Sequence, residues 1–180
     1  MTPMLVRNLL YMDSSYILEL VVTDAGRQFY PPVGTIERRT DENAGYDLKV
    51  VKDVPYSCNA VLAPLGVRAR LIKNDKYYNG YMDGVAEFHF TLEPRSSIFK
   101  SGFMMANGRG IIDKSYRGEL QAPVISVGKS TGPVERSIDA GTRLFQILAP
   151  DLGWIREVRY VSSLPETIRG DGGFGSTGSK

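Results

Sequence analysis

Apolar and polar residues alternate with a period of two over much of this 180-residue chain. The clearest run is 86–93, in which Ala86, Phe88, Phe90 and Leu92 alternate with polar residues. This pattern is typical of a β-strand with one buried and one wet face, because successive side chains of a strand point to opposite sides. Similar strands are expected at 17–22, 46–50, 67–71 and 157–161.

Turn-forming dipeptides separate the predicted strands. The chain has 19 glycines and 10 prolines, which is high for a helical protein. Pairs such as Asn79-Gly80 and Asn107-Gly108 fall between apolar runs and favour tight turns. Many short strands joined by frequent turns predict an all-β sandwich or barrel.

One short helical pattern follows Pro94. Ser96 or Ser97 is placed to cap it, because a hydroxyl oxygen accepts a hydrogen bond from the first free amides of a helix. The residues expected to face inward from this segment are Ile98, Phe99 and Phe103.

Charge and rare residue types exclude several kinds of site. Lys and Arg number 22 and Asp and Glu number 20, so the net charge of +2 offers no large positive field, and we expect no nucleic-acid partner. The single cysteine, Cys58, cannot form an intramolecular disulfide, and the single histidine, His89, excludes a site of several His or Cys metal ligands. Because His89 falls on the polar side of a predicted strand, we interpret it as a surface residue rather than a ligand or a base.

No segment has the pattern of a membrane span or a signal peptide. Asp13 and Glu19 interrupt the apolar start, and the charge-poor stretch 54–67 is short and contains Pro55 and Pro64. We therefore expect a soluble intracellular protein with no membrane partner, and leave its compartment open.

The last twelve residues, 169–180, differ from everything before them. Five of the twelve are glycine, and Phe174 is the only apolar side chain. Such a segment cannot bury enough surface to offset its ordering entropy, so we predict a flexible arm after a single domain at 1–168. A frayed terminus is the simplest interpretation, but Arg, Phe, Ser and Thr among glycines also suit a clamp on a phosphate and a ring.

Five short segments stand out by their order along the chain. They are Ala44-Gly45-Tyr46-Asp47-Leu48, Pro94-Arg95-Ser96-Ser97, residues 110–118 (GIIDKSYRG), residues 141–146 (GTRLFQ) and residues 169–178 (RGDGGFGSTG).

Together these segments resemble the five ordered motifs of the trimeric deoxyuridine triphosphatases (dUTPases), over roughly residue 44 to the C-terminus. AGYDL or PRSS alone would occur by chance, whereas five segments in order form a specific pattern. The resemblance implies a jelly-roll-like β-barrel of short strands with one short helix and a flexible C-terminal arm. It also implies an enzyme, a dUTP diphosphatase that hydrolyses dUTP to dUMP and pyrophosphate.

Asp113 is the candidate general base. It follows an apolar pair in a glycine-flanked turn, so its carboxylate can point into a cleft. The resemblance implies that it activates the water that attacks the α-phosphorus, which a carboxylate within hydrogen-bond reach can do near neutral pH. On spacing alone, a turn Asp bonded to its own backbone would be the more ordinary interpretation.

The resemblance also implies a set of substrate-binding residues. A β-hairpin between Asn107 and Tyr116 would hold the uracil edge with its backbone, and the Tyr116 ring would pack under the deoxyribose and exclude a 2′-hydroxyl. Arg95, Ser96 and Ser97 would contact phosphates, with Gln146 nearby, and the arm would close over the nucleotide. The complete predicted set is Arg95, Ser96, Ser97, Asn107, Gly110, Ile111, Ile112, Tyr116, Gln146, Arg169, Phe174, Gly175, Ser176 and Thr177.

A cofactor and an assembly follow from the same resemblance. Mg²⁺ is expected, held through the triphosphate and waters with no direct protein ligand. The family forms homotrimers with sites at subunit interfaces, where we expect Arg143 to act, in part through Asp47.

Two other functions compete with dUTP hydrolysis. One is a dCTP deaminase of the same fold. The other is a nucleotide-sensing regulatory protein, whose protein partner could dock on the long N-terminus or on an enlarged loop at 74–81.

Overall fold

The computed structural model describes residues 15–57, 59–75, 84–127 and 137–173. These residues form short strands and two 3₁₀-helices, with no α-helix among them, which confirms the predicted all-β class. No helix in these ranges is long and apolar enough to cross a bilayer. The elements are β1 (Tyr16–Val22), η1 (Asp24–Gly26), β2 (Ile36–Arg38), β3 (Tyr46–Lys49), β4 (Val54–Pro55), β5 (Val61–Pro64), β6 (Val67–Asp75), β7 (Gly84–Phe88), β8 (Phe90–Pro94), η3 (Ser96–Lys100), β9 (Phe103–Met105), β10 (Gly110–Ile112), β11 (Gln121–Ser126), β12 (Ser137–Ile138), β13 (Arg143–Leu148) and β14 (Ile155–Tyr160).

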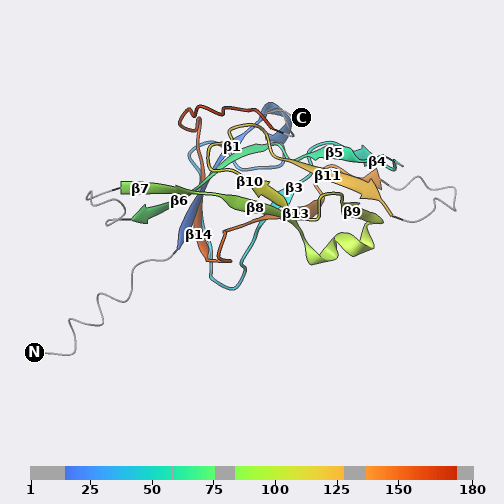
Figure 1. Ribbon diagram of the computed structural model, residues 1–180, viewed down its shortest axis with the longest axis horizontal. Coiled ribbons are helices and arrows are strands. Elements are labelled where there is room, and N and C mark those ends of the chain that lie inside the picture. The colour runs from blue at the N-terminus through green and yellow to red at the C-terminus, as the bar shows by residue number, and fades with distance from the viewer. Residues whose placement is uncertain (1–14, 58, 76–83, 128–136, 174–180) are drawn as a thin grey trace, which may run out of the picture.

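Within the described ranges the strands pair into four sheets (Figure 1). The five-stranded sheet has the order β2-β14-β1-β6-β7, and its β1–β14 pair is parallel. The four-stranded sheet has the order β10-β8-β13-β3 and is antiparallel. The smaller sheets are β5-β11-β9 and β12-β4.

One core lies between the sheets. Strands of all four sheets contribute to a single cluster of buried side chains, in which Tyr16, Phe90, Phe103, Phe145 and Tyr160 are among the largest. Burying each such side chain contributes about 1.5–3 kcal/mol, so this cluster is the main force that holds the sheets together. The predicted inward positions Val67, Ala69 and Leu71 all belong to it, as the alternation requires.

The alternating run at 86–93 forms two strands rather than one. Strand β7 ends at Phe88 in the five-stranded sheet, and β8 begins at Phe90 in the four-stranded sheet. His89 is the single residue at which the chain passes from one sheet to the other. The alternation predicts the buried residues Ala86, Phe90 and Leu92 correctly, but it carries no information about which strands pair.

Two further expectations about the segment after Pro94 are wrong. The helix η3 is a 3₁₀-helix that begins at Ser96, and its capping residue Arg95 makes no side-chain cap hydrogen bond, so neither serine is the cap. Phe103 is buried and Ile98 packs against the core, but Phe99 is 75% exposed. With three residues per turn, neighbouring side chains of a 3₁₀-helix point about 120° apart, so Ile98 and Phe99 cannot both face the core.

The β-hairpin predicted between Asn107 and Tyr116 does not form. Strand β9 pairs with β11, and β10 pairs with β8, so the turn at 107–109 joins strands of two different sheets. Asn107-Gly108 makes the tight turn that its sequence favours, with Gly108 at φ +66°. The pairing partners are determined by long-range packing, which a local turn pattern does not report.

Candidate active site

Asp113 lies at a pocket beside β10. A turn follows this strand, in which the Tyr116 amide donates to the Asp113 carbonyl at 2.9 Å. The turn, β10 and the start of the C-terminal arm enclose a cavity of about 220 Å³. This cavity, here called the Asp113 pocket, is lined by Leu92, Met105, Asn107, Gly110, Ile111, Ile112, Asp113, Tyr116, Leu120, Gln121, Arg169 and Gly173.

The two carboxylate oxygens of Asp113 have different partners. Oδ2 pairs with the Arg169 guanidinium of the arm. Oδ1 lies 3.3 Å from His89 Nδ1, and the same ring nitrogen accepts a hydrogen bond from the Lys114 amide at 3.2 Å. The Asp113 side chain stays 42% exposed, so it is accessible to a substrate and to water.

Tyr116 forms one wall of the Asp113 pocket. Its hydroxyl donates to the Glu119 carbonyl at 2.9 Å, which fixes the ring, and burial raises the pKa of its hydroxyl. The Arg169 guanidinium lies 5.8 Å from the ring centroid. A Cβ atom at Gly173 would come within 3.1 Å of the ring, so the arm begins in close contact with Tyr116.

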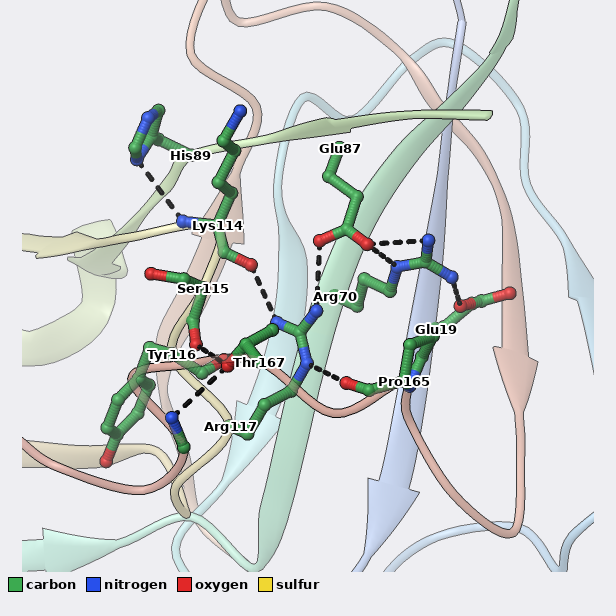
Figure 2. Close-up of polar contacts among 11 residues, drawn as sticks. Glu19, Arg70, Glu87, His89, Lys114, Ser115, Tyr116, Arg117, Pro165 and Thr167 are labelled. Carbon is green, nitrogen blue, oxygen red and sulfur yellow. Dashed lines mark hydrogen bonds and ion pairs between the residues drawn. The ribbon is translucent and has the colours of Figure 1, made fainter. Parts of the chain in front are cut away.

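Arg117 ties the turn of Asp113 to the base of the arm (Figure 2). Its buried guanidinium donates to the Lys114 carbonyl at 2.6 Å and to the Pro165 carbonyl at 2.8 Å. Its own amide donates to the Gly170 carbonyl at 2.7 Å. A second link joins the same two segments, because the Thr167 hydroxyl donates to the Ser115 carbonyl. The arm therefore starts from a fixed point next to the candidate base.

Alternating charges extend from Arg117 into the five-stranded sheet (Figure 2). Glu87 accepts from Arg117 at 2.9 Å and pairs with Arg70 at 2.7 Å, and Arg70 pairs with Glu19 at 3.1 Å. Burial alone would raise the pKa of Glu87, but the hydrogen bonds from Arg117 and Arg70 outweigh it and lower the pKa. We call Glu19, Arg70, Glu87 and Arg117 the charge network.

A second cavity is lined by residues of β3, of β13 and of the segment that follows β8. It has a volume of about 610 Å³ and is here called the Arg95 pocket. Within it, Asp47 pairs with Arg95 at 2.8 Å, and its other oxygen lies 3.5 Å from Arg143 of the same chain, whereas the role expected for Arg143 at a subunit interface stays a prediction. The lining residues are Arg39, Glu42, Asn43, Ala44, Gly45, Tyr46, Asp47, Arg95, Ser96, Gln146, Leu148 and Leu152.

Gly45 makes room for Gln146 in the Arg95 pocket. A Cβ atom at position 45 would lie 2.1 Å from Gln146 Oε1, so only glycine leaves the amide where it is. The Gln146 side chain donates to the Pro94 carbonyl at 3.3 Å. The first and fourth sequence motifs are therefore packed directly against each other.

The predicted site residues divide between the two pockets. Asp113, Asn107, Tyr116, Arg169 and residues 110–112 line the Asp113 pocket. Arg95, Ser96 and Gln146 line the Arg95 pocket, and the two pockets share no lining residue. Ser97 lines neither pocket. Phe174, Gly175, Ser176 and Thr177 lie outside the described residues.

Comparison with known proteins shows which family this sequence matches. The dUTPase family model matches residues 32–178. The deoxyuridine 5'-triphosphate nucleotidohydrolase of Rickettsia felis is 34% identical over 79% of this chain and 86% of its own length. The enzyme of the same name from Leptospira interrogans is 33% identical over 78% of this chain and 88% of its own length.

The chain belongs to the dUTPase family. A solved structure of a dUTPase from Streptococcus mutans is also similar, with a TM-score of 0.47 and 24% sequence identity over 79% of this chain and 96% of the other. Family membership rests on the sequence matches, and the residues matched by the family model include all five motifs.

Sequence reasoning missed the roles of two residues near Asp113. His89 is exposed, as predicted, but it lies against Asp113. Ile112 pairs with Phe90, so continuing this register by one residue places Asp113 opposite His89. Arg117 belongs to the third motif, but its role depends on carbonyls at 114 and 165, and only the folded chain brings these together.

Proposed function

We propose that this protein hydrolyses dUTP to dUMP and pyrophosphate, with Asp113 as the general base. The observation that carries the proposal is the position of Asp113. The accessible Asp113 carboxylate lies at a pocket that Tyr116 and the arm residue Arg169 also line. The family match supports a nucleotidohydrolase and favours it over the dCTP deaminase alternative.

The base and the sugar would occupy the Asp113 pocket. Strand β10 is an edge strand, so one row of its amides and carbonyls is not used by the sheet. Such groups, with the Asn107 side chain, are fixed donors and acceptors that suit the edge of uracil and leave cytosine unpaired. The fixed Tyr116 ring would exclude a ribose 2′-hydroxyl sterically.

The reaction needs one proton acceptor near the α-phosphorus. Asp113 would take a proton from a bound water as the water oxygen forms its bond to the α-phosphorus and pyrophosphate leaves with the electron pair of the broken P–O bond. Before this step, Arg169 would leave Asp113 and bind the phosphates, since its fork of donors binds either anion. This exchange frees Oδ2 to accept the proton.

Mg²⁺ fits this site through the substrate. The Asp47 carboxylate is already paired with Arg95 and Arg143, so phosphate oxygens and waters would supply the ligands of the ion. The bound ion would neutralise charge on the triphosphate. Asp47 would contact its waters.

A complete site would need more than one copy of the chain. The Arg95 pocket is lined by residues of β3, of β13 and of the segment that follows β8, and the Asp113 pocket by residues of β8, of β10 and of the turn after β10. His89, which lies against Asp113, precedes β8 and Arg95 follows it, so six residues of extended chain, roughly 20 Å, separate the two ends. A homotrimer would bring Arg95, Ser96 and Gln146 of one copy to Asp113 of the next.

The arm would close each site. Arg169 begins the arm beside Asp113, and Phe174, Ser176 and Thr177 would stack on the base and bind phosphates. Closure would exclude other water and fix the triphosphate in line for attack.

A pyrophosphate-release assay with dATP, dCTP, dGTP, dTTP and dUTP tests the proposal. We expect turnover with dUTP and rates at least about a hundredfold lower with the other four, because an unpaired base leaves site groups unsatisfied. Conversion of dCTP to dUTP would indicate the deaminase. Tight dUTP binding with no product would favour the regulatory alternative.

A further inference from the structure

His89 meets Asp113 because of where the chain changes sheets. The residue stands between β7 and β8, and the register of β8 with β10 places it beside the residue that follows Ile112. The ring is 58% exposed, and its Nδ1 lies 3.3 Å from Asp113 Oδ1. Figure 2 shows the same ring bonded to the Lys114 amide, so one side chain contacts two consecutive residues of the catalytic turn.

Whether Nδ1 carries a proton determines whether it can accept from the Lys114 amide or donate to Asp113. A backbone amide can only donate, so the 3.2 Å bond from Lys114 requires an unprotonated Nδ1. Nδ1 and Oδ1 then face each other as two acceptors, and the carboxylate keeps its full capacity to take a proton. When Nδ1 gains a proton, it donates to Oδ1 and the Lys114 amide loses its acceptor.

We propose that His89 is a positioning residue for the general base. In its neutral form the ring holds the Asp113 turn, and in its protonated form it donates to the Asp113 carboxylate and slows turnover. The proposal rests on the proposed function, in which Asp113 takes a proton from water. Because Nδ1 either accepts from Lys114 or donates to Asp113, the contact links the rate to the protonation state of this ring.

Asp113 and Lys114 of the turn contact the ring, Arg169 of the arm contacts Asp113, and Glu87 of β7 lies two residues before His89 in the chain. Glu87 forms ion pairs with Arg70 and Arg117, and Arg169 forms an ion pair with Asp113 Oδ2. Asp113 Oδ1 is therefore the anionic atom that meets the ring.

The test compares log kcat against pH for wild type, His89→Asn and His89→Phe with dUTP. An Asn oxygen can accept from the Lys114 amide but gains no proton, so this variant should stay within about twofold of wild type at pH 8 and be several-fold faster than wild type near pH 6. Phe offers no acceptor, so kcat should fall about tenfold at every pH with KM nearly unchanged. Superimposable profiles for wild type and His89→Asn, or full activity of His89→Phe, would overturn the proposal.

A second readout does not depend on activity. The chain has one histidine, so the proton NMR signals of the imidazole need no assignment. Replacing Asp113 by Asn changes the group beside Nδ1 and should move these signals when both proteins are measured at the same pH. Identical spectra would refute the contact. A wild type that cannot hydrolyse dUTP would refute the proposed function, and the spectra would still decide whether His89 and Asp113 interact.

Discussion

Single atoms decide how the Arg95 pocket is built. Gly45 lacks the one carbon that would collide with Gln146, and Gln146 in turn holds the Pro94 carbonyl just before Arg95. The sequence predicts Gln146 and Arg95 as phosphate-side residues, but it cannot show that a glycine 101 positions earlier in the chain fixes the glutamine, because that contact joins β13 to the residue before β3.

Gly45→Ala tests this contact. The new methyl group should push the Gln146 amide out of place and raise KM for dUTP about tenfold, the cost of one lost hydrogen bond of about 1.4 kcal/mol. Steady-state kinetics would measure the change. In a Gln146→Ala background the same substitution should have little further effect, and an undiminished effect there would show that Gly45 acts in another way.

At the scale of the strands, the sequence predicts which side chains are buried but not which strands pair. Alternation along β6, β7 and β8 predicts the buried faces, because side-chain direction is a local property of an extended chain. Pairing is not local: the turn at 107–109 looks like a hairpin turn, yet β9 and β10 join different sheets. For the same reason the sequence predicts Asp113 in a turn but not its contact with His89 from the β7–β8 junction.

The charge network gives these elements a pH-dependent link. The pKa of Glu87 is lowered in the folded chain from its ordinary value of 4.5, so its stabilisation is present above that pH and is lost as the pH falls through the lower, folded-state value. Glu87→Gln should lower the free energy of unfolding by about 1–3 kcal/mol at pH 7, because Arg117 and Arg70 lose a charged partner.

Urea unfolding of wild type and Glu87→Gln at a series of pH values would measure this effect. The difference between the two proteins should shrink as the pH falls below about 4.5. A difference that stays constant down to pH 3 would contradict the ionic role of Glu87. Glu166→Gln, which alters an exposed carboxylate, is the matched control and should cost less than about 0.5 kcal/mol at pH 7.

At the scale of the whole molecule, the two pockets form two halves of a proposed site toward opposite ends of β8. The five motifs contribute residues to both pockets, but no sequence pattern shows that Asp113 and Arg95 lie at different ends of one strand. Association of identical copies places one half beside the other without any change in fold.

Mixing two inactive variants tests the shared site. Asp113→Asn and Arg95→Ala should each be inactive alone, while co-assembled copies should recover activity. If each site takes Asp113 from one copy and Arg95 from another, about a quarter of the sites in an equal mixture are intact, since each half is intact with a probability of one half. Pyrophosphate release would report the recovery. Absence of any recovery in verified mixed oligomers would place both halves in one chain.

The most direct test of the account is the turnover of Asp113→Asn with dUTP, measured beside its affinity for the nucleotide. The substitution keeps the shape of the side chain and removes its capacity to take a proton. We expect dUTP to bind within a few-fold of wild type and kcat to fall by about 10²–10⁴. Turnover at the wild-type rate would contradict the account, because it would remove Asp113 from the chemistry.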